Sequence, residues 1–290
     1  MQGSLRNADS PPMERDLDAE EFRLYHDLIH RLTGIHYPAD KRSLLSNRLR
    51  RRLRTTGLTE YLAYLSHIQS PGQKVELQGF LDSITTNETY FFRCQRHWDL
   101  FRDWAKAQLG QPEARRHGLR IWSAAASSGA EAYTILIVLE QALGEGFGGL
   151  RVEVLGTDLS QTVLTEAQKG IYRPYALAQT PQDVQRRYFT KIDDEHFQID
   201  KRLSSFVTFR PHNLMDPLPN RTFDFVFLRN VMIYFDRPSK ERVLANVRQV
   251  LRPGGMLLVG ESESLLNITH QMTYLQPSLF TMPVPQPVRG

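Results

Sequence analysis

The sequence has a single cysteine, Cys94, among its 290 residues. One cysteine excludes an internal disulfide framework and a thiolate zinc site, and it fits a reducing compartment. Long apolar runs are also lacking, since the longest, "YTILIVL" at 133–139, is far shorter than a membrane span. The first sixteen residues are polar and contain proline, without the apolar core of a signal peptide. We therefore expect a cytoplasmic protein that does not insert into a membrane.

A strong excess of charge of one sign is absent as well. Lys and Arg number 36 against 32 Asp and Glu, which gives a net charge of +4. This bias is too weak by itself to indicate a nucleic-acid-binding protein. Hydrophobic residues make up 41% and charged residues 23%, as in soluble globular proteins, and the length allows one large domain or two smaller ones.

The sequence also lacks the common phosphate-binding patterns. Neither G-x-x-x-x-G-K-[ST] nor G-x-G-x-x-G occurs, and the small-residue stretch "AAASSGAEA" at 124–132 contains one glycine. Dinucleotide binding is therefore disfavoured. A nucleoside without phosphates stays possible, and S-adenosylmethionine is a common one.

The first third of the chain has the periodicity of helices. Asp18 and Glu21 form a candidate capping box before a run of apolar residues that ends at Gly34. The next segment, "KRSLLSNRLRRRLRTTG" at 41–57, repeats leucine at every fourth position, and two shorter amphipathic segments follow at 58–72 and 73–84. These patterns predict a small helical region.

From residue 119 onward, strand patterns alternate with helix patterns. Strands are predicted at 119–123, 151–158, 205–213, 223–230 and 256–264, and helices at 130–144, 160–170 and 239–255. This alternation predicts a doubly wound sheet of parallel strands, in which ligands bind beyond the carboxyl ends of the strands.

A small or polar group lies at or just after the carboxyl end of each predicted strand. A single such residue is explained by an ordinary polar loop, but five in succession favour a shared ligand. Asp158, which ends the second strand, is suited to accept hydrogen bonds from two ribose hydroxyls. The groups in chain order are Ser127 to Gly129, Asp158, Asn213, Arg229 with Asn230, and Glu261 with Ser262.

Five segments together resemble the motifs of CheR-type chemoreceptor glutamate O-methyltransferases. They are "TTNETYFFR", "RIWSAAASSGAEAYTI", "GTDLSQTVLTEAQKGIYR", "FLRNVMIYFD" and "LRPGGMLLVGESESL", and the resemblance extends over about residues 18–282. It implies a Rossmann-like α/β sheet of the class I methyltransferases, a small all-α N-terminal domain and a small antiparallel β insertion. The expected boundaries are a flexible tail at 1–16, the helical domain at 17–84, a linker and connecting helix at 85–118, the methyltransferase domain at 119–282 with the β subdomain at about 188–212, and a tail at 283–290.

The resemblance also implies the site residues. The segment between the domains would fold over S-adenosylmethionine, with Phe91 and Phe92 as apolar anchors that also pack in the core. Arg93 and Tyr234 would lie near the transferred methyl group as catalytic residues. The cofactor-binding positions would be Asn87, Thr89, Arg93, Ala130, Asp158, Asn213, Leu214, Arg229 and Asn230. Ala130 departs from the family, which carries a glutamate there, so weaker cofactor binding is expected.

The implied reaction is the methylation of a glutamate side chain, with S-adenosylhomocysteine as the second product. A carboxylate is ionised at neutral pH, so no general base is needed. No metal is expected either. His26 and His30 are spaced for one helix face, but nothing near them in the sequence completes a metal site.

The implied partner is a chemoreceptor with an acidic helical methylation region. Arg48, Arg51 and Arg52 in the basic helix at 41–54 would dock that region by charge attraction. The segment 188–203 has no glycine, and we expect the enzyme not to need a C-terminal tether peptide of the receptor.

Two alternatives remain open from the residues. A nucleic-acid methyltransferase could use the same arginine run to bind phosphates, although neither an Asn/Asp-Pro-Pro-aromatic tetrapeptide nor a Pro-Cys pair occurs. The second alternative is a regulatory protein that binds the cofactor but has no activity.

Overall fold

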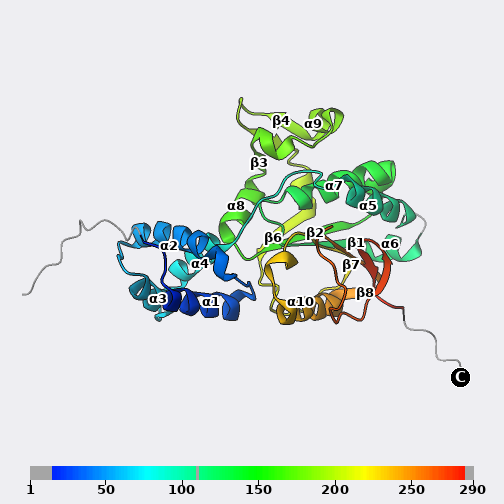
Figure 1. The fold of residues 1–290 in the computed structure, drawn as a ribbon. Coiled ribbons are helices and arrows are strands. Elements are labelled where there is room, and N and C mark those ends of the chain that lie inside the picture. The colour runs from blue at the N-terminus through cyan, green and yellow to red at the C-terminus, as the bar shows by residue number, and fades with distance from the viewer. Residues whose placement is uncertain (1–14, 109–110, 285–290) are drawn as a thin grey trace, which may run out of the picture. The chain divides into compact units, whose positions relative to one another are not determined.

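The computed structural model describes residues 15–108 and 111–284 (Figure 1). The chain divides into two compact units, one up to Thr86 and one from Asn87 onward. We call them the helical unit and the sheet unit. The predicted tails at 1–16 and 283–290 fall mostly outside the described residues.

The helical unit contains α1 (Ala19–Thr33), α2 (Arg42–Thr56), α3 (Tyr61–Gln69) and α4 (Lys74–Ile84). The predicted capping box is confirmed, because Asp18 accepts a hydrogen bond from the Glu21 N–H and the Glu21 carboxylate accepts one from the Asp18 N–H. The helix ends at Gly34, whose φ of 72° places it in the left-handed region that glycine tolerates. The fourth-position leucines of α2 are buried in the core of this unit, as expected: Leu45, Leu49 and Leu53.

The sheet unit is built on one large twisted sheet. Within the described residues, seven strands lie in the order β6-β2-β1-β7-β8-β10-β9. The first five in that order are parallel, which confirms the doubly wound prediction. Their bounds are β1 (Leu119–Ala124), β2 (Val152–Asp158), β6 (Val207–Pro211), β7 (Phe223–Leu228) and β8 (Leu251–Val259).

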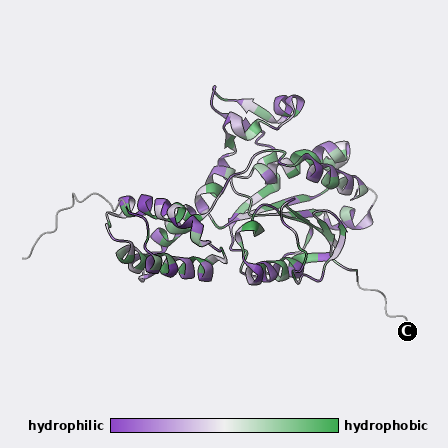
Figure 2. Ribbon diagram, in the orientation of Figure 1, coloured by the Kyte–Doolittle hydropathy of each residue, from purple (hydrophilic) through white to green (hydrophobic). Residues whose placement is uncertain are grey.

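Two helices precede the first strand and others connect the strands. They are α5 (Gln95–Gln108), α6 (Pro112–His117), α7 (Ala130–Leu143), α8 (Gln161–Lys169) and α10 (Arg237–Val250). The helix α7 is buried almost all round, as its apolar sequence predicts, whereas α10 exposes a polar side. Figure 2 shows hydrophilic (purple) and hydrophobic (green) residues mixed along helices such as α10.

A second, small sheet is formed by the part of the chain between α8 and β6. It consists of β3 (Ile171–Tyr172), β4 (Phe189–Lys191) and β5 (Phe197–Ile199), in the antiparallel order β3-β5-β4, with α9 (Gln182–Tyr188) between β3 and β4. The predicted antiparallel insertion is therefore present. Its limits differ from the expected 188–212, because β3 begins it at 171 and β6 pairs with β2 of the main sheet.

Three other expectations need correction. The helix expected over 239–255 ends at Val250, because Leu251 already pairs with Phe223 as the start of β8. The expected linker and connecting helix at 85–118 contain a second, short helix, α6. The antiparallel edge strands β9 (Thr273–Gln276) and β10 (Leu279–Thr281) were not predicted, since the alternating pattern ends before them.

Candidate active site

The turn after β1 brings the backbone to the carboxyl edge of the sheet in an unusual conformation. Ala125, Ser127 and Gly129 have φ values of 68°, 50° and 86°. At Gly129 a Cβ atom would lie 2.8 Å from the Cβ of Ala167 and 2.9 Å from the ring of Phe209. Only glycine fits this position, because the backbone lies so close to Ala167 and Phe209. The turn leads directly into the N-terminus of α7.

Asp158 ends β2 and holds this turn. It is buried, and its carboxylate accepts hydrogen bonds from the N–H groups of Ser127 and Ser160, both at 2.9 Å. Each carboxylate oxygen has two lone pairs, so the same group can accept further hydrogen bonds. The predicted ribose-binding residue thus lies beside the β1 turn, as the parallel sheet requires.

The segment that begins at Asn87 is attached to the same edge. The Ser127 hydroxyl donates to the Asn87 carbonyl at 2.7 Å, and the Phe91 N–H donates to the Ala176 carbonyl at 2.9 Å. Phe91 and Phe92 are buried, and the Phe91 ring lies edge-on to other rings of the sheet unit. Core packing of both phenylalanines is therefore confirmed. Their anchoring keeps the polar residues of the segment, including Thr89, at this edge.

Arg229 follows β7 and lies at the centre of a buried polar group. Its guanidinium donates to the Glu131 carboxylate at 3.0 Å and to the Arg93 carbonyl at 2.5 Å, and it lies 5.2 Å from the centre of the Trp98 ring. Glu131 also accepts a hydrogen bond from the Ser123 hydroxyl at 2.7 Å. Burial raises the pKa of Glu131, and the two donors oppose that rise. The pair fixes the position of the Arg93 backbone.

The loop after β8 supplies an acceptor that the sequence analysis missed. The Glu263 carboxylate is buried and accepts hydrogen bonds from the N–H groups of residues 230, 231, 232, 233 and 260, at 2.6–3.3 Å. It thereby shapes the turn that carries Asn230 and Tyr234. Asn230 has a φ of 58°, a conformation that asparagine adopts more readily than most residues. The sequence did offer a signal for Glu263, which is the second glutamate of "GESES" at 260–264.

Three predicted cofactor positions lie at the ends of other elements. Ala130 is fully buried as the first residue of α7. The Asn213 side-chain oxygen accepts from the Met215 N–H at 3.1 Å, and the Leu214 carbonyl accepts from the Asn246 amide at 3.0 Å. Both follow β6, next to the end of β2.

The two predicted catalytic side chains are less enclosed. Arg93 is half-buried, donates to the Glu88 carbonyl at 3.3 Å and lies 5.5 Å from the centre of the Tyr90 ring. Tyr234 is half-buried at the end of a short 3-10 turn, Met232–Tyr234. Both belong to segments that meet the carboxyl edge of the sheet.

The chemistry of this edge fits a nucleoside ligand. It offers the Asp158 carboxylate and the glycine-containing turn, and the His212 Nε2 atom is buried without a hydrogen-bond partner among the described residues. These groups suit hydroxyl and ring nitrogen partners. A polar, uncharged ligand face satisfies them better than a phosphate would.

The three predicted docking arginines lie on α2 of the helical unit. Arg48 donates to the Tyr37 hydroxyl at 2.5 Å, to the Ile84 carbonyl and to the Thr86 hydroxyl at 2.8 Å. Arg52 binds both oxygens of Glu76, at 2.5 and 3.0 Å. Arg51 is exposed, as are three other cations of the same stretch: Lys41, Arg42 and Arg54.

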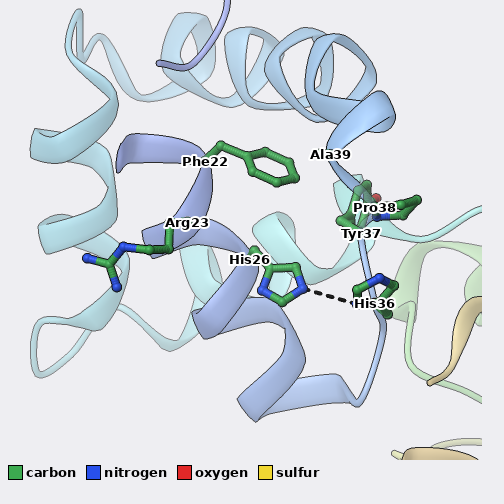
Figure 3. A pocket seen from close by; sticks show the side chains of 7 residues that line it. All are labelled: Phe22, Arg23, His26, His36, Tyr37, Pro38 and Ala39. Atoms are coloured by element: carbon green, nitrogen blue, oxygen red, sulfur yellow. Dashed lines mark hydrogen bonds between the residues drawn. The ribbon is translucent and has the colours of Figure 1, made fainter. Parts of the chain in front are cut away.

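An open pocket of about 360 Å³ lies in the helical unit (Figure 3). There His26 Nε2 lies 3.2 Å from His36 Nδ1, and His26 also stacks on His30. The sequence analysis did not foresee His36 at this position. Among the described residues, the pair does not belong to any group of three metal-ligating side chains. The pocket is lined by Phe22, Arg23, His26, His36, Tyr37, Pro38 and Ala39.

Within residues 15–108 and 111–284, no helix has the length and apolar character needed to cross a membrane.

Comparison with known protein families covers both units. Residues 20–85 match the family described as the CheR methyltransferase all-alpha domain, and residues 87–279 match the CheR methyltransferase SAM binding domain. S-adenosylmethionine is therefore the cofactor of the sheet unit, as expected.

Curated relatives agree with these matches over most of their length. A chemotaxis protein methyltransferase of Escherichia coli (strain K12) is 36% identical over 92% of this chain and 92% of the relative. Chemotaxis protein methyltransferase 2 of Pseudomonas aeruginosa is 37% identical over 87% of this chain and 89% of the relative. A chemotaxis protein methyltransferase of Borreliella burgdorferi is 31% identical over 87% of this chain and 90% of the relative. The nucleic-acid methyltransferase alternative is not favoured by these relationships. The chain belongs to the CheR methyltransferase family.

Proposed function

We propose that the protein transfers a methyl group from S-adenosylmethionine to glutamate side chains of a chemoreceptor, in the cytoplasm. One observation carries the proposal: the segment with Asn87 and Arg93 is fixed to the carboxyl edge of the sheet at both ends. Ser127 holds the Asn87 carbonyl, and Arg229 holds the Arg93 carbonyl. These two anchors support a single site for the residues proposed to bind the cofactor and the acceptor carboxylate.

The reaction needs positioning more than acid–base chemistry. When bound, S-adenosylmethionine supplies a sulfonium methyl group that an ionised carboxylate can accept by direct in-line displacement. Asp158 would hold the ribose, and the half-buried Arg93 would orient the acceptor carboxylate. Tyr234 would restrict the path of the methyl group. The remaining cofactor positions in the proposal are Asn87, Thr89, Ala130, Asn213, Leu214, Arg229 and Asn230.

The proposed docking surface is the set of exposed cations along α2 and directly before it. Arg48 and Arg52 make several contacts inside the helical unit, so replacing them would also perturb that unit. The exposed cations Lys41, Arg42, Arg51 and Arg54 are better suited to attract an acidic receptor helix over a distance of about a Debye length, roughly 8–10 Å at physiological salt.

The proposal also includes independence from a receptor tether peptide. Strands β4 and β5 have three residues each, and the loop between them is closed by Asp193 with His196 at 2.9 Å and by Lys191 with Asp194 at 2.7 Å. No glycine widens this segment for strand addition. A receptor with its C-terminal tether peptide removed should be methylated as fast as the intact receptor. A micromolar dissociation constant for the free peptide in calorimetry would contradict this.

The main test supplies radiolabelled cofactor together with receptor-containing membranes, RNA or DNA. We expect base-labile label on the receptor and none on nucleic acid, because a methyl ester hydrolyses in base. Arg93→Ala should lose most of this transfer with an unchanged melting temperature. Arg102→Ala, on the exposed side of α5, is the matched control and should retain it.

Two outcomes would contradict the proposal. Label only on nucleic acid would support a nucleic-acid methyltransferase instead. Cofactor binding without transfer to any acceptor would favour the regulatory protein.

A further inference from the structure

Three metal-ligating side chains meet beside the Arg93 backbone. Cys94 and His97 lie at the start of α5, and Glu261 lies in the loop after β8. The cysteine sulfur, a ring nitrogen and a carboxylate oxygen all lie within 4.8 Å of one another. Ligand atoms around a tetrahedral zinc ion lie roughly 3.3–3.7 Å apart, given metal–ligand bonds of about 2.0–2.3 Å. An adjustment of about 1 Å therefore closes the set, and the exposed Glu261, which already forms a hydrogen bond with the Cys94 thiol, lies where it can make it.

The two ring nitrogens of the histidine in this group need an explanation. His97 is 1% exposed, and neither ring nitrogen has a hydrogen-bond partner among the described residues. Buried polar groups in native proteins nearly always have a partner, and an exception needs an explanation. Burial, reinforced by Arg229, lowers the pKa of His97 to about 4, so the ring is neutral and offers a lone pair.

The charges of the group suit a divalent cation. A thiolate and a carboxylate together balance two positive charges, and the nearby Arg229 guanidinium is already paired with Glu131. Metal binding would convert the Cys94 thiol to a thiolate with release of a proton, and the N-terminus of α5 would help to stabilise that thiolate.

We propose that Cys94, His97 and Glu261 form a zinc site with an open fourth position for water. Sulfur and imidazole ligands favour zinc over magnesium or calcium, and three protein ligands with a solvent-facing side are typical of open zinc sites. A thiolate zinc site was excluded on the cysteine count, and this proposal revises that conclusion for a site with one cysteine. The ion would join the segment that carries Arg93 to the end of β8.

Cobalt provides a specific test, because a thiolate bound to Co²⁺ gives a charge-transfer band in the near ultraviolet. Cys94 is the only cysteine in the chain, so such a band can arise from no other residue. Chelator-treated protein titrated with Co²⁺ should develop the band, saturate at one equivalent and lose the band when Zn²⁺ is added. The variant Cys94→Ser should show no band.

The other two ligands are tested by substitution. His97→Gln and Glu261→Gln should each weaken Co²⁺ binding at least about tenfold, since even indirect partners of metal ligands contribute 10–100-fold. His36→Ala is the matched control, because it removes the imidazole pair in the other unit (Figure 3) and should leave the band unchanged. A thermal melt of each variant checks folding, and the exposed Glu261 decides the case if His97→Gln fails to fold.

Absence of the band in the unmodified protein would overturn the proposal. It would also be overturned if the band appeared but kept its affinity in Glu261→Gln, because Glu261 would then not be a ligand and the three-residue site would not exist.

Discussion

Replacing Glu263 by glutamine tests whether one carboxylate shapes the turn that carries Asn230 and Tyr234. The substitution keeps the size of the side chain but turns one acceptor oxygen into an NH₂ donor. In the native protein one oxygen accepts from the N–H groups of Asn230 and Gly260, at 2.8 and 2.6 Å. Glutamine would leave at least these two N–H groups unsatisfied if it keeps the other contacts.

The expected cost follows from those two hydrogen bonds. A hydrogen bond to a charged group contributes about 1.5–3 kcal/mol, so two lost bonds cost about 3–6 kcal/mol before relaxation. Water entry and movement of the loop should reduce this, and we expect a loss of about 3 kcal/mol in the free energy of unfolding. A domain is commonly stable by only about 5–15 kcal/mol, so the effect should be large.

Urea unfolding followed by tryptophan fluorescence measures this loss. All three tryptophans, Trp98, Trp104 and Trp122, belong to the sheet unit that contains Glu263, so the signal reports that unit alone. Methyl transfer should fall as well, since the turn would lose its shape. The control is Glu261→Gln in a chelating buffer, because this carboxylate is exposed and lies two residues away. If Glu263→Gln stayed within about 0.5 kcal/mol of the unmodified protein, the carboxylate would not be what shapes the turn.

Three further predictions concern acid stability, cofactor affinity and docking. Arg15 binds both carboxylate oxygens of Glu21 and holds the pKa of Glu21 below its ordinary value of 4.5. Glu21 therefore stabilises the folded chain above pH 4.5. This contribution is lost as the pH falls through the pKa of the folded state. Glu21→Gln should therefore lower stability by about 1–2 kcal/mol at neutral pH and by almost nothing in strong acid, and an equal difference at both in urea unfolding would contradict the assignment. Ala130→Glu should bind S-adenosylhomocysteine about 10–100 times more tightly in calorimetry, with Ala130→Gln as the uncharged control, and unchanged affinity in a folded variant would count against a cofactor role for this position. Reversing Arg51 and Arg54 to glutamate should slow receptor methylation and weaken its dependence on salt without changing cofactor affinity, whereas a salt-insensitive native rate would contradict electrostatic docking.

Local sequence patterns were sufficient for the elements that depend on short-range physics. The capping box at Asp18 and Glu21 satisfies backbone groups within one helical turn, and the fourth-position leucines of α2 define its buried side. Alternation of strands and helices predicted parallel pairing, because each helical crossover brings the next strand into the sheet in the same direction as the one before. Asp158 could be placed at the carboxyl edge for the same reason. The family was predicted from its motifs, and the comparisons confirmed it.

Other features depend on partners that are distant in the sequence. Leu251 belongs to a strand because it pairs with Phe223, which its local pattern does not show. Glu131 is fixed by Arg229, 98 residues away, and Glu263 receives the N–H groups of a turn about 30 residues before it. Sequence spacing gave no indication that His36 approaches His26, or that Glu261 approaches Cys94 and His97.

The sequence by itself therefore determined most of the helices, the parallel sheet and the edge at which the proposed cofactor-binding residues lie. The tertiary structure decided which charged side chains are held by internal partners, as Arg48, Arg52, Arg229 and Glu131 are, and which remain exposed. The physical reason is that periodicity and capping act over a few residues, whereas the pairing and burial of charges depend on which segments the folded chain brings together.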